Sequence, residues 1–335
     1  MQNTSYQNLI IGFGKAGKTL AGFLAKKGET VALVERSKER YGGTCINVAC
    51  IPSKSLEYSA RLSAAAGGDF AAKAERYRAA IAEKRRLTAM LREKNYAKVT
   101  GTGAVVIDGE ASFVDAHTVR IVGADGEQTV TAEHIFINTG ALPFVPPIPG
   151  AAESTHVYTS ETMMELDDLP EKLVIIGGGY IGLEFAFMYR AFGSEVTVLD
   201  AGETFLPRED RDIAAEMQRI LEAKGVRLVL GAATQRFEEG AQHTTAVTSK
   251  GRFDADAILL ATGRRPNTDG LALEKAGVAV TERGFIQVDE HLRAAPHIWA
   301  MGDVAGSPQF TYISLDDWRI VRDQLFGQGQ RSTAD

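Results

Sequence analysis

One pattern occurs twice in this chain of 335 residues, and it constrains the fold more than any other feature. Each copy is an apolar run, a glycine pattern G-x-G-x-x-G, a helical stretch and a second apolar run that ends in an acid. The copies contain Gly12, Gly14, Gly17 and the acid Glu35, and then Gly177, Gly179, Gly182 and the acid Asp200. Strand, glycine turn, helix and strand in this order place a pyrophosphate on the helix N-terminus and the acid at a ribose hydroxyl. The sequence therefore predicts an α/β protein with two Rossmann-like dinucleotide-binding domains.

Both cysteines of the chain, Cys45 and Cys50, lie in the run 42–54 that follows the first copy. Only four residues separate them, so a structural disulfide would stabilise the fold by only about 2 kcal/mol. A closed zinc site needs four ligands, and the sequence has no second cysteine pair. A helix that begins between Cys45 and Pro52 would place its positive end at the sulfurs and favour the thiolate. We therefore favour a redox function over a structural disulfide or half of a zinc site.

The run 42–54 resembles the redox-disulfide motif of the pyridine nucleotide–disulfide oxidoreductases, flavoproteins that include glutathione reductase, dihydrolipoamide dehydrogenase and mercuric reductase. Residues 135–140, 259–267 and 298–303 are similar to cofactor-binding segments of the same family. The resemblance implies FAD on the first glycine pattern and a nicotinamide nucleotide on the second, where the carboxylate of Asp200 favours NADH, with NADPH as an alternative. The implied FAD contacts are Gly12, Gly14, Gly17, Glu35, Gly43, Thr44, Thr139, Gly140, Gly302 and Asp303. The implied NAD contacts are Gly177, Gly179, Gly182, Asp200, Gly263 and Arg264.

The same resemblance implies an electron path and a set of catalytic residues. Electrons would pass from NADH through FAD to a Cys45–Cys50 disulfide, with Cys50 next to the flavin and Cys45 facing the electron acceptor. Tyr180 is expected to cover the flavin and to swing away when the nicotinamide arrives. Lys54 is expected to form a buried ion pair with Glu184 near the flavin.

A narrower resemblance is to the bacterial copper(II) reductases of reactive-chlorine resistance within this family. The phrases that carry it lie outside the shared motifs, at 12–20, 145–150, 205–213 and 309–317. It implies reduction of Cu(II) in a stress response, with the soft thiolates of Cys45 and Cys50 as candidate copper contacts. Dihydrolipoamide dehydrogenase, mercuric reductase and other disulfide reductases stay open as alternatives, as does a redox-sensing NAD-binding flavoprotein without turnover.

The length of the chain suggests two domains. The expected FAD domain is discontinuous, 1–150 with 270–335, and carries the redox disulfide, whereas the expected NAD(P)H domain is 151–269. The family's C-terminal interface domain is expected to be absent from this chain. A full-length protein is therefore expected to be a homodimer and these 335 residues a monomer.

The amino-acid composition limits the classes of partner that the protein is expected to bind. A formal charge of −6 argues against binding to nucleic acid. No segment approaches the ~18 uninterrupted apolar residues of a membrane span. The start lacks the features of a signal peptide, and scarce cysteine is typical of a reducing compartment, so we expect a cytoplasmic protein. The expected partner is a small-molecule or metal-ion electron acceptor.

Local patterns predict further elements. We expect helices over about 45–66, 70–98 and 210–224, broken between the first two by glycines at 67 and 68. Short strands are expected over 99–137 and a strand meander over 235–258. The proline-rich stretch 143–150 is the expected linker.

Overall fold

A computed structural model describes residues 3–335, and they form two compact units. The first unit comprises the chain up to residue 47 together with 88–142 and 265–335, and the second comprises 48–87 and 143–264. Each unit contains one of the two glycine patterns. The α/β class expected from the sequence is confirmed.

The units differ from the expected domains chiefly at residues 48–87. These residues cluster with the second unit, because Leu56, Ala60 and Tyr77 are buried in the same core as Tyr189. The proline-rich stretch begins where the chain passes into the second unit at Pro143. The assignment of FAD to the first unit and of the pyridine nucleotide to the second stays a prediction.

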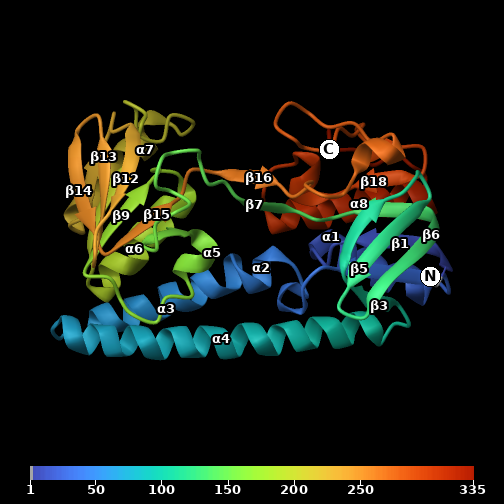
Figure 1. Cartoon of the computed structure of the whole chain (residues 1–335), viewed down its shortest axis with the longest axis horizontal. Helices are drawn as coiled ribbons and strands as arrows, with labels where there is room; N and C mark the ends of the chain where they lie inside the picture. The colour runs from blue at the N-terminus through green and yellow to red at the C-terminus, as the bar shows by residue number, and fades with distance from the viewer. Residues whose placement is uncertain (1–2) are drawn as a thin grey trace. The chain divides into compact units, whose positions relative to one another are not determined.

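The first unit is built on a mostly parallel sheet in the order β17-β18-β6-β1-β2-β3 (Figure 1). Its central strand β1 (Asn3–Ile11) is parallel to both β2 (Val31–Glu35) and β6 (Gly126–Ile137). A central parallel strand is covered on both faces, which explains why its last three residues, 9–11, are all apolar and buried. The other strands are β3 (Val105–Asp108), β4 (Glu110–Phe113), β5 (Thr118–Gly123), β7 (Ala141–Pro143), β17 (Arg293–Ala295) and β18 (Ile298–Ala300).

Alternate residues of β1 point into two different cores of this unit. Ile10 packs with the helices α1 (Lys15–Lys26) and α8 (Thr311–Phe326). Leu9 and Ile11 pack instead with the β4–β5 hairpin and the segment 271–286. The sheet is therefore the middle of three layers. Short elements complete the unit, namely η1 (Lys38–Arg40), α2 (Thr44–Asn47), η2 (Leu273–Ala276) and η3 (Gly302–Ala305).

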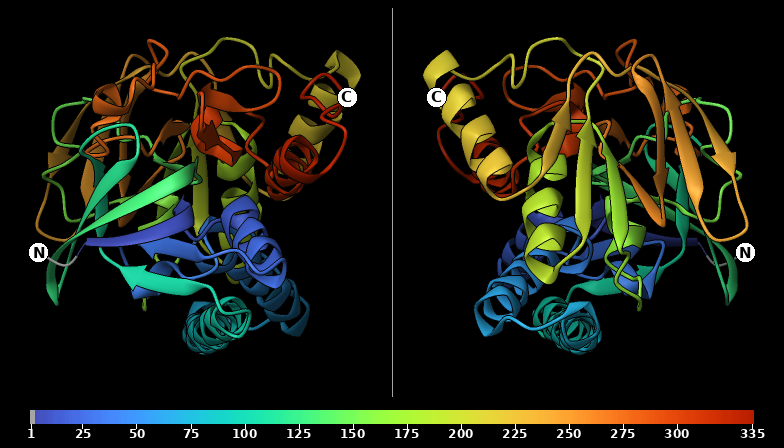
Figure 2. Two further views of the ribbon diagram at one scale, coloured as in Figure 1. Left: turned by 90° about the vertical axis from the view of Figure 1, so that its right-hand side faces the viewer. Right: turned by 90° about the vertical axis from the view of Figure 1, so that its left-hand side faces the viewer.

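The second unit repeats the design with a parallel sheet in the order β11-β10-β9-β15-β8. Figure 2 shows the antiparallel meander β12-β13-β14 and the helix α6 (Tyr180–Phe192) on opposite sides of this sheet. The elements are α3 (Cys50–Ala66), β8 (Val157–Thr159), α5 (Ser160–Met163), β9 (Lys172–Ile176), β10 (Glu195–Leu199), α7 (Arg211–Ala223), β11 (Arg227–Val229), β12 (Thr234–Glu239), β13 (Thr244–Thr248), β14 (Gly251–Ala255) and β15 (Ala257–Leu260). The strand β16 (Arg264–Pro266) pairs with β7.

The long helix α4 (Phe70–Thr100) and the helix α7 begin and end close to their expected limits. One helix prediction is wrong. The chain expected to be helical from Cys45 to Ala66 is interrupted, because Ala49 has φ −141° and ψ −104°. The predicted meander is present as β12 to β14, but its last two residues, 257 and 258, belong to β15, which joins the parallel sheet beside β9. Among the helices of residues 3–335, none has the length and apolar composition needed to cross a bilayer.

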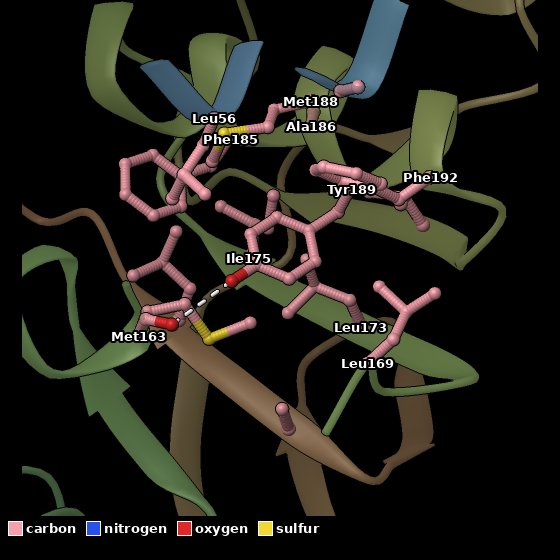
Figure 3. Packing of buried hydrophobic residues seen from close by; sticks show 14 of the residues in the cluster. Leu56, Met163, Leu169, Leu173, Ile175, Phe185, Ala186, Met188, Tyr189 and Phe192 are labelled. Atoms are coloured by element: carbon pink, nitrogen blue, oxygen red, sulfur yellow. Dashed lines mark hydrogen bonds between the residues drawn. The ribbon is translucent and has the colours of Figure 1, made fainter. Parts of the chain in front are cut away.

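The core of the second unit includes buried polar contacts made by the hydroxyl of Tyr189. In Figure 3 the phenol of Tyr189 points at the carbonyl oxygen of Met163, to which it donates at 3.0 Å. The same hydroxyl lies 3.0 Å from the hydroxyl of Tyr77, and both tyrosines are fully buried. Burial raises the pKa of Tyr189 well above its usual value, so the hydroxyl stays protonated as a donor.

We expect Tyr189→Phe to lower the free energy of unfolding by about 1–3 kcal/mol, because it leaves buried polar atoms of Met163 and Tyr77 without this partner. Urea unfolding followed by circular dichroism measures the change. Tyr58→Phe is the control, since Tyr58 is exposed and its hydroxyl should matter by less than about 0.5 kcal/mol. Equal losses in the two variants would contradict the prediction.

Candidate dinucleotide and redox sites

The first glycine turn lies against the end of β6. Gly12 has φ +103°, and a Cβ there would lie 2.4 Å from the carbonyl oxygen of Asn138. A Cβ at Gly14 would lie 2.3 Å from Asn138 Oδ1, and one at Gly17 would lie 2.7 Å from the carbonyl oxygen of Gly12. These glycines are therefore required by the protein's own packing. Gly14 is also the N-cap of α1 and offers no side chain to cap it.

The two acids of the glycine patterns make equivalent hydrogen bonds. Glu35 accepts from the amides of Phe13 at 3.1 Å and Ser37 at 3.3 Å. Asp200 accepts from the amides of Gly178 and Gly202, both at 2.8 Å. In each copy the acid thus holds the residue after the first glycine and the residue two positions after itself. Glu35 is buried, which raises the pKa of its carboxyl group.

The second glycine turn repeats this packing with one difference. Gly177 has φ +107°, and a Cβ there would lie 2.5 Å from the carbonyl oxygen of Ala261. A Cβ at Gly182 would lie 2.1 Å from the carbonyl oxygen of Gly177. At Gly179, however, a Cβ would meet no described atom within 4 Å. The protein's own packing does not require a glycine at 179, which leaves room there for a ligand's close approach.

The redox motif begins on the first unit. A Cβ at Gly43 would lie 2.7 Å from the Cα of Gly14, so this loop touches the first glycine turn. Lys18 Nζ donates to the carbonyl oxygen of Gly42 at 2.8 Å and to Asn95 Oδ1 at 2.8 Å. Burial, followed by the charge of nearby Lys15, lowers the pKa of Lys18 to about 8. The sequence reasoning did not single out Lys18, although it directly follows the third glycine of the pattern.

The two cysteines lie on different elements. Cys45 is half-buried on the single turn α2, in the first unit, and Cys50 is exposed at the first residue of α3, in the second unit. The positive end of a 17-residue helix therefore lies at Cys50, where it favours the thiolate. The expectation of one helix whose positive end serves both sulfurs is replaced by this arrangement.

The expected partnership of Lys54 and Glu184 is present. Lys54 Nζ lies 2.6 Å from Glu184 Oε1, to which Ser53 Oγ also donates at 2.9 Å. The side chain of Lys54 is 68% exposed and that of Glu184 is 30% exposed among the protein's own atoms, and the burial of this pair beside the flavin stays a prediction. Tyr180 is exposed too, and its hydroxyl donates to Glu209 Oε1 at 2.5 Å.

The remaining expected contacts lie at strand ends. Thr139 and Gly140 follow β6, and the hydroxyl of Thr139 is buried without a hydrogen-bond partner among residues 3–335. Gly302 and Asp303 begin η3, directly after β18. Thr44 is the first residue of α2, and a Cβ at Gly140 would lie 3.8 Å from its hydroxyl. In the second unit, Gly263 follows β15, and Arg264 lies 4.0 Å from Glu161.

Three buried polar side chains at or near the first glycine turn lie in segments noted in the sequence but were not singled out there, namely Asn138, Ser314 and Asp317. Their exposed fractions are 5%, 8% and 2%. The available signal was weak: Asn138 is a polar residue that ends an apolar run, and the other two are polar residues on the buried face of a helix.

The residues present fit two dinucleotides. Each unit has a glycine turn at a helix N-terminus and an acid fixed by backbone amides. The orphaned hydroxyl of Thr139 in the first unit and the open space at Gly179 in the second are features that a bound ligand would explain. The described residues contain no group of three or more His, Cys, Asp or Glu side chains arranged to hold a metal ion.

We expect Gly177→Ala to lower the free energy of unfolding by about 2–5 kcal/mol, because of its positive φ and its contact with Ala261. Gly179→Ala should change it by less than about 1 kcal/mol, because the added methyl group meets nothing. Gly179→Ala should nevertheless weaken NAD⁺ binding by about tenfold or more, as measured by calorimetry. Unchanged NAD⁺ affinity in Gly179→Ala would show that the pyrophosphate does not approach this glycine.

Comparisons with known proteins agree with this geometry. Residues 6–317 match the family model of the pyridine nucleotide-disulphide oxidoreductases. The chain is 48% identical over 332 residues to the probable pyridine nucleotide-disulfide oxidoreductase RclA of Escherichia coli, covering 98% of this chain and 73% of that protein. It is 34% identical to the dihydrolipoyl dehydrogenase of Geobacillus stearothermophilus, covering 96% of this chain and 70% of that protein.

A solved structure is similar throughout. The Cu(II) complex of the HOCl-induced flavoprotein disulfide reductase RclA from Escherichia coli matches with a TM-score of 0.93 and 47% identity, over 99% of this chain and 73% of that chain. The two dinucleotide folds, the redox motif and these similarities together show that the chain belongs to the pyridine nucleotide-disulphide oxidoreductase family, as an FAD-dependent oxidoreductase that uses a pyridine nucleotide.

Proposed function

We propose that this protein passes electrons from NADH to Cu(II) through its cysteine pair, in defence against oxidative, reactive-chlorine stress. The observation that carries the proposal is the redox motif, with Cys50 at the N-terminus of α3 and Lys54 paired with Glu184 one turn further along that helix. The copper assignment is supported by the Cu(II) complex of the Escherichia coli RclA protein. Soft thiolate ligands suit Cu(I), the product of the reduction.

FAD is assigned to the first glycine pattern and the pyridine nucleotide to the second. Two first-turn amides of α1 donate to protein side chains, those of Ala16 to Ser314 Oγ and of Gly17 to Asn138 Oδ1. In α6 no side chain of the described residues accepts from the equivalent amides of Ile181 or Gly182. A turn that the protein itself holds fixed suits a cofactor that stays bound, whereas an unfilled turn suits a substrate that exchanges.

When bound, FAD supplies two-electron transfer between a nicotinamide and a disulfide. The protein's own residues bind the two dinucleotides and stabilise the charge of the thiolate. Glu35 and Asp200 offer fixed carboxylate oxygens to the riboses, and the first turn of α3 stabilises the thiolate of Cys50. Cys45 is assigned as the sulfur that meets the acceptor. Re-formation of the disulfide from the dithiolate releases two electrons, which reduce two Cu(II) ions to Cu(I).

Tyr180 is assigned as the residue that covers the flavin until the nicotinamide arrives, and Lys54 with Glu184 as the pair that tunes the electron affinity of the flavin. The remaining expected contacts keep their proposed roles, FAD for those in the first unit and NAD for Gly263 and Arg264. Location in the cytoplasm, a homodimer for a longer chain and a monomer for these 335 residues stay predictions. Light scattering measures the oligomeric state.

Copper reduction is tested with purified FAD-loaded protein, NADH, Cu(II) and a Cu(I)-specific chelator under anaerobic conditions. We expect two Cu(I) for each NADH consumed, and a loss of at least tenfold in rate for Cys45→Ser and for Cys50→Ser. Lipoamide and Hg(II) are assayed as acceptors beside Cu(II). Faster turnover with lipoamide or Hg(II) would favour the other reductases of the family, and no turnover with any acceptor would favour a sensor.

We expect a preference for NADH over NADPH, because the carboxylate of Asp200 accepts from a 2′-hydroxyl and repels a 2′-phosphate. Asp200→Ala should narrow the ratio of kcat/KM for the two nucleotides by about tenfold. Asp256→Ala is the matched control, because Asp256 also accepts from a backbone amide of the second unit, that of Lys172 at 2.8 Å. Equal use of NADPH by the unaltered protein would contradict the prediction.

A further inference from the structure

The helix α1 is capped by side chains remote in sequence. Its N-cap is Gly14, so the capping atoms must come from elsewhere. Ser314 Oγ accepts from the amide of Ala16 at 3.3 Å, and Asn138 Oδ1 accepts from the amide of Gly17 at 2.9 Å. Within residues 3–335, the amides that precede them, of Gly14 and Lys15, donate to no protein acceptor. These two amides are therefore the ones available to an anion at this helix.

The same side chains also hold the segment that contains Asp303. Asn138 Nδ2 donates to the carbonyl oxygen of Met301 at 2.6 Å. Asp317 accepts from the amide of Gly302 at 2.6 Å and from Ser307 Oγ at 3.3 Å. Three segments far apart in sequence, the glycine turn, the end of β6 and the start of η3, are thus joined by one set of hydrogen bonds.

This set of hydrogen bonds is tightly enclosed. A Cβ at Gly302 would lie 2.9 Å from Ser314 Oγ and 3.0 Å from Asn138 Nδ2, and one at Gly14 would lie 2.3 Å from Asn138 Oδ1. A side chain larger than that of glycine therefore does not fit at either position without displacing these hydrogen-bonding groups.

The burial of the carboxylate of Asp317 costs free energy. It is 2% exposed and forms no ion pair with any residue of the described chain. Burial, together with the nearby carboxylates of Asp316 and Asp303, raises its pKa to about 6. A buried carboxylate without a cation destabilises a fold, and residues that do so are typical of functional sites.

We propose that Asn138, Ser314 and Asp317 are positioning residues for FAD, which fix the glycine turn and the Gly302–Asp303 turn before the cofactor binds. They leave the amides of Gly14 and Lys15 to meet the pyrophosphate. This inference rests on the assignment of FAD to the first glycine pattern. Its consequence is slow release of FAD, because little of the binding energy is used to order the protein.

The test is the Kd for FAD, measured by flavin fluorescence on apoprotein refilled with FAD. Asn138→Ala should raise it by about tenfold and Ser314→Ala by about threefold, because each leaves an amide of α1 without its buried acceptor. The Kd for NAD⁺ should stay within twofold. The matched control is Asn8→Ala, which removes a buried asparagine of the same unit that donates to Glu29.

The outcomes separate this inference from the site assignment. If Glu35→Ala weakens FAD binding while Asn138→Ala and Ser314→Ala act no more strongly than Asn8→Ala, the positioning role is overturned and the assignment stands. If FAD affinity responds to Asp200→Ala and not to Glu35→Ala, the assignment itself is wrong and the inference falls with it.

A pH profile gives a second readout that does not depend on whether the alanine variants fold. Below pH 6 Asp317 becomes protonated and loses its charge-assisted bond to Gly302, so FAD should dissociate faster. The raised pKa means that this group makes the fold itself more stable as the pH falls from about 6 to 4, the opposite direction. Asp317→Asn should remove the step near pH 6, whereas Glu35→Gln, which removes the other raised carboxyl, should retain it. A step that survives in Asp317→Asn would overturn the role of Asp317.

Discussion

Two backbone segments in each unit approach so closely that no side chain fits between them, and the rest of each site depends on this contact. In the first unit Gly12 lies against Asn138, and in the second Gly177 lies against Ala261. Each glycine directly follows a parallel strand, β1 or β9, and each partner directly follows the neighbouring strand, β6 or β15. The contact fixes the two strand ends together. The helix N-terminus and the threonine–glycine pair that follows Asn138 or Ala261 therefore lie at the same edge of the sheet.

The two units then diverge in how they treat that edge. The first unit fills it with buried polar side chains, which satisfy amides of α1 and carry an uncompensated carboxylate at Asp317. In the second, no side chain of the described residues accepts from the corresponding amides of α6, and a Cβ at Gly179 would meet no described atom within 4 Å. This contrast supports the proposal that the first unit binds a cofactor that stays bound and the second a nucleotide that exchanges. The difference resides in side chains outside the glycine patterns.

The redox motif depends on the interruption at Ala49. A continuous helix from Cys45 to Ala66 would have only one N-terminus and would place Cys50 inside it. The break gives Cys50 a helix start of its own, and the 17 residues of α3 supply the dipole that favours its thiolate. Four residues along α3 from Cys50, Lys54 pairs with Glu184, which also accepts a hydrogen bond from Ser53.

The sequence alone determined the α/β class, both glycine turns with their acids, and the partnership of Lys54 with Glu184, because fixed spacing and a long family motif encode local geometry. It could not determine that residues 48–87 pack with the second unit, or that Asn138 caps α1, since both depend on contacts between segments more than a hundred residues apart. Capping by a remote side chain has no local spacing to detect. The tertiary structure brings the ends of β6 and β18 to the N-terminus of α1. Only this arrangement decided where those buried polar groups act.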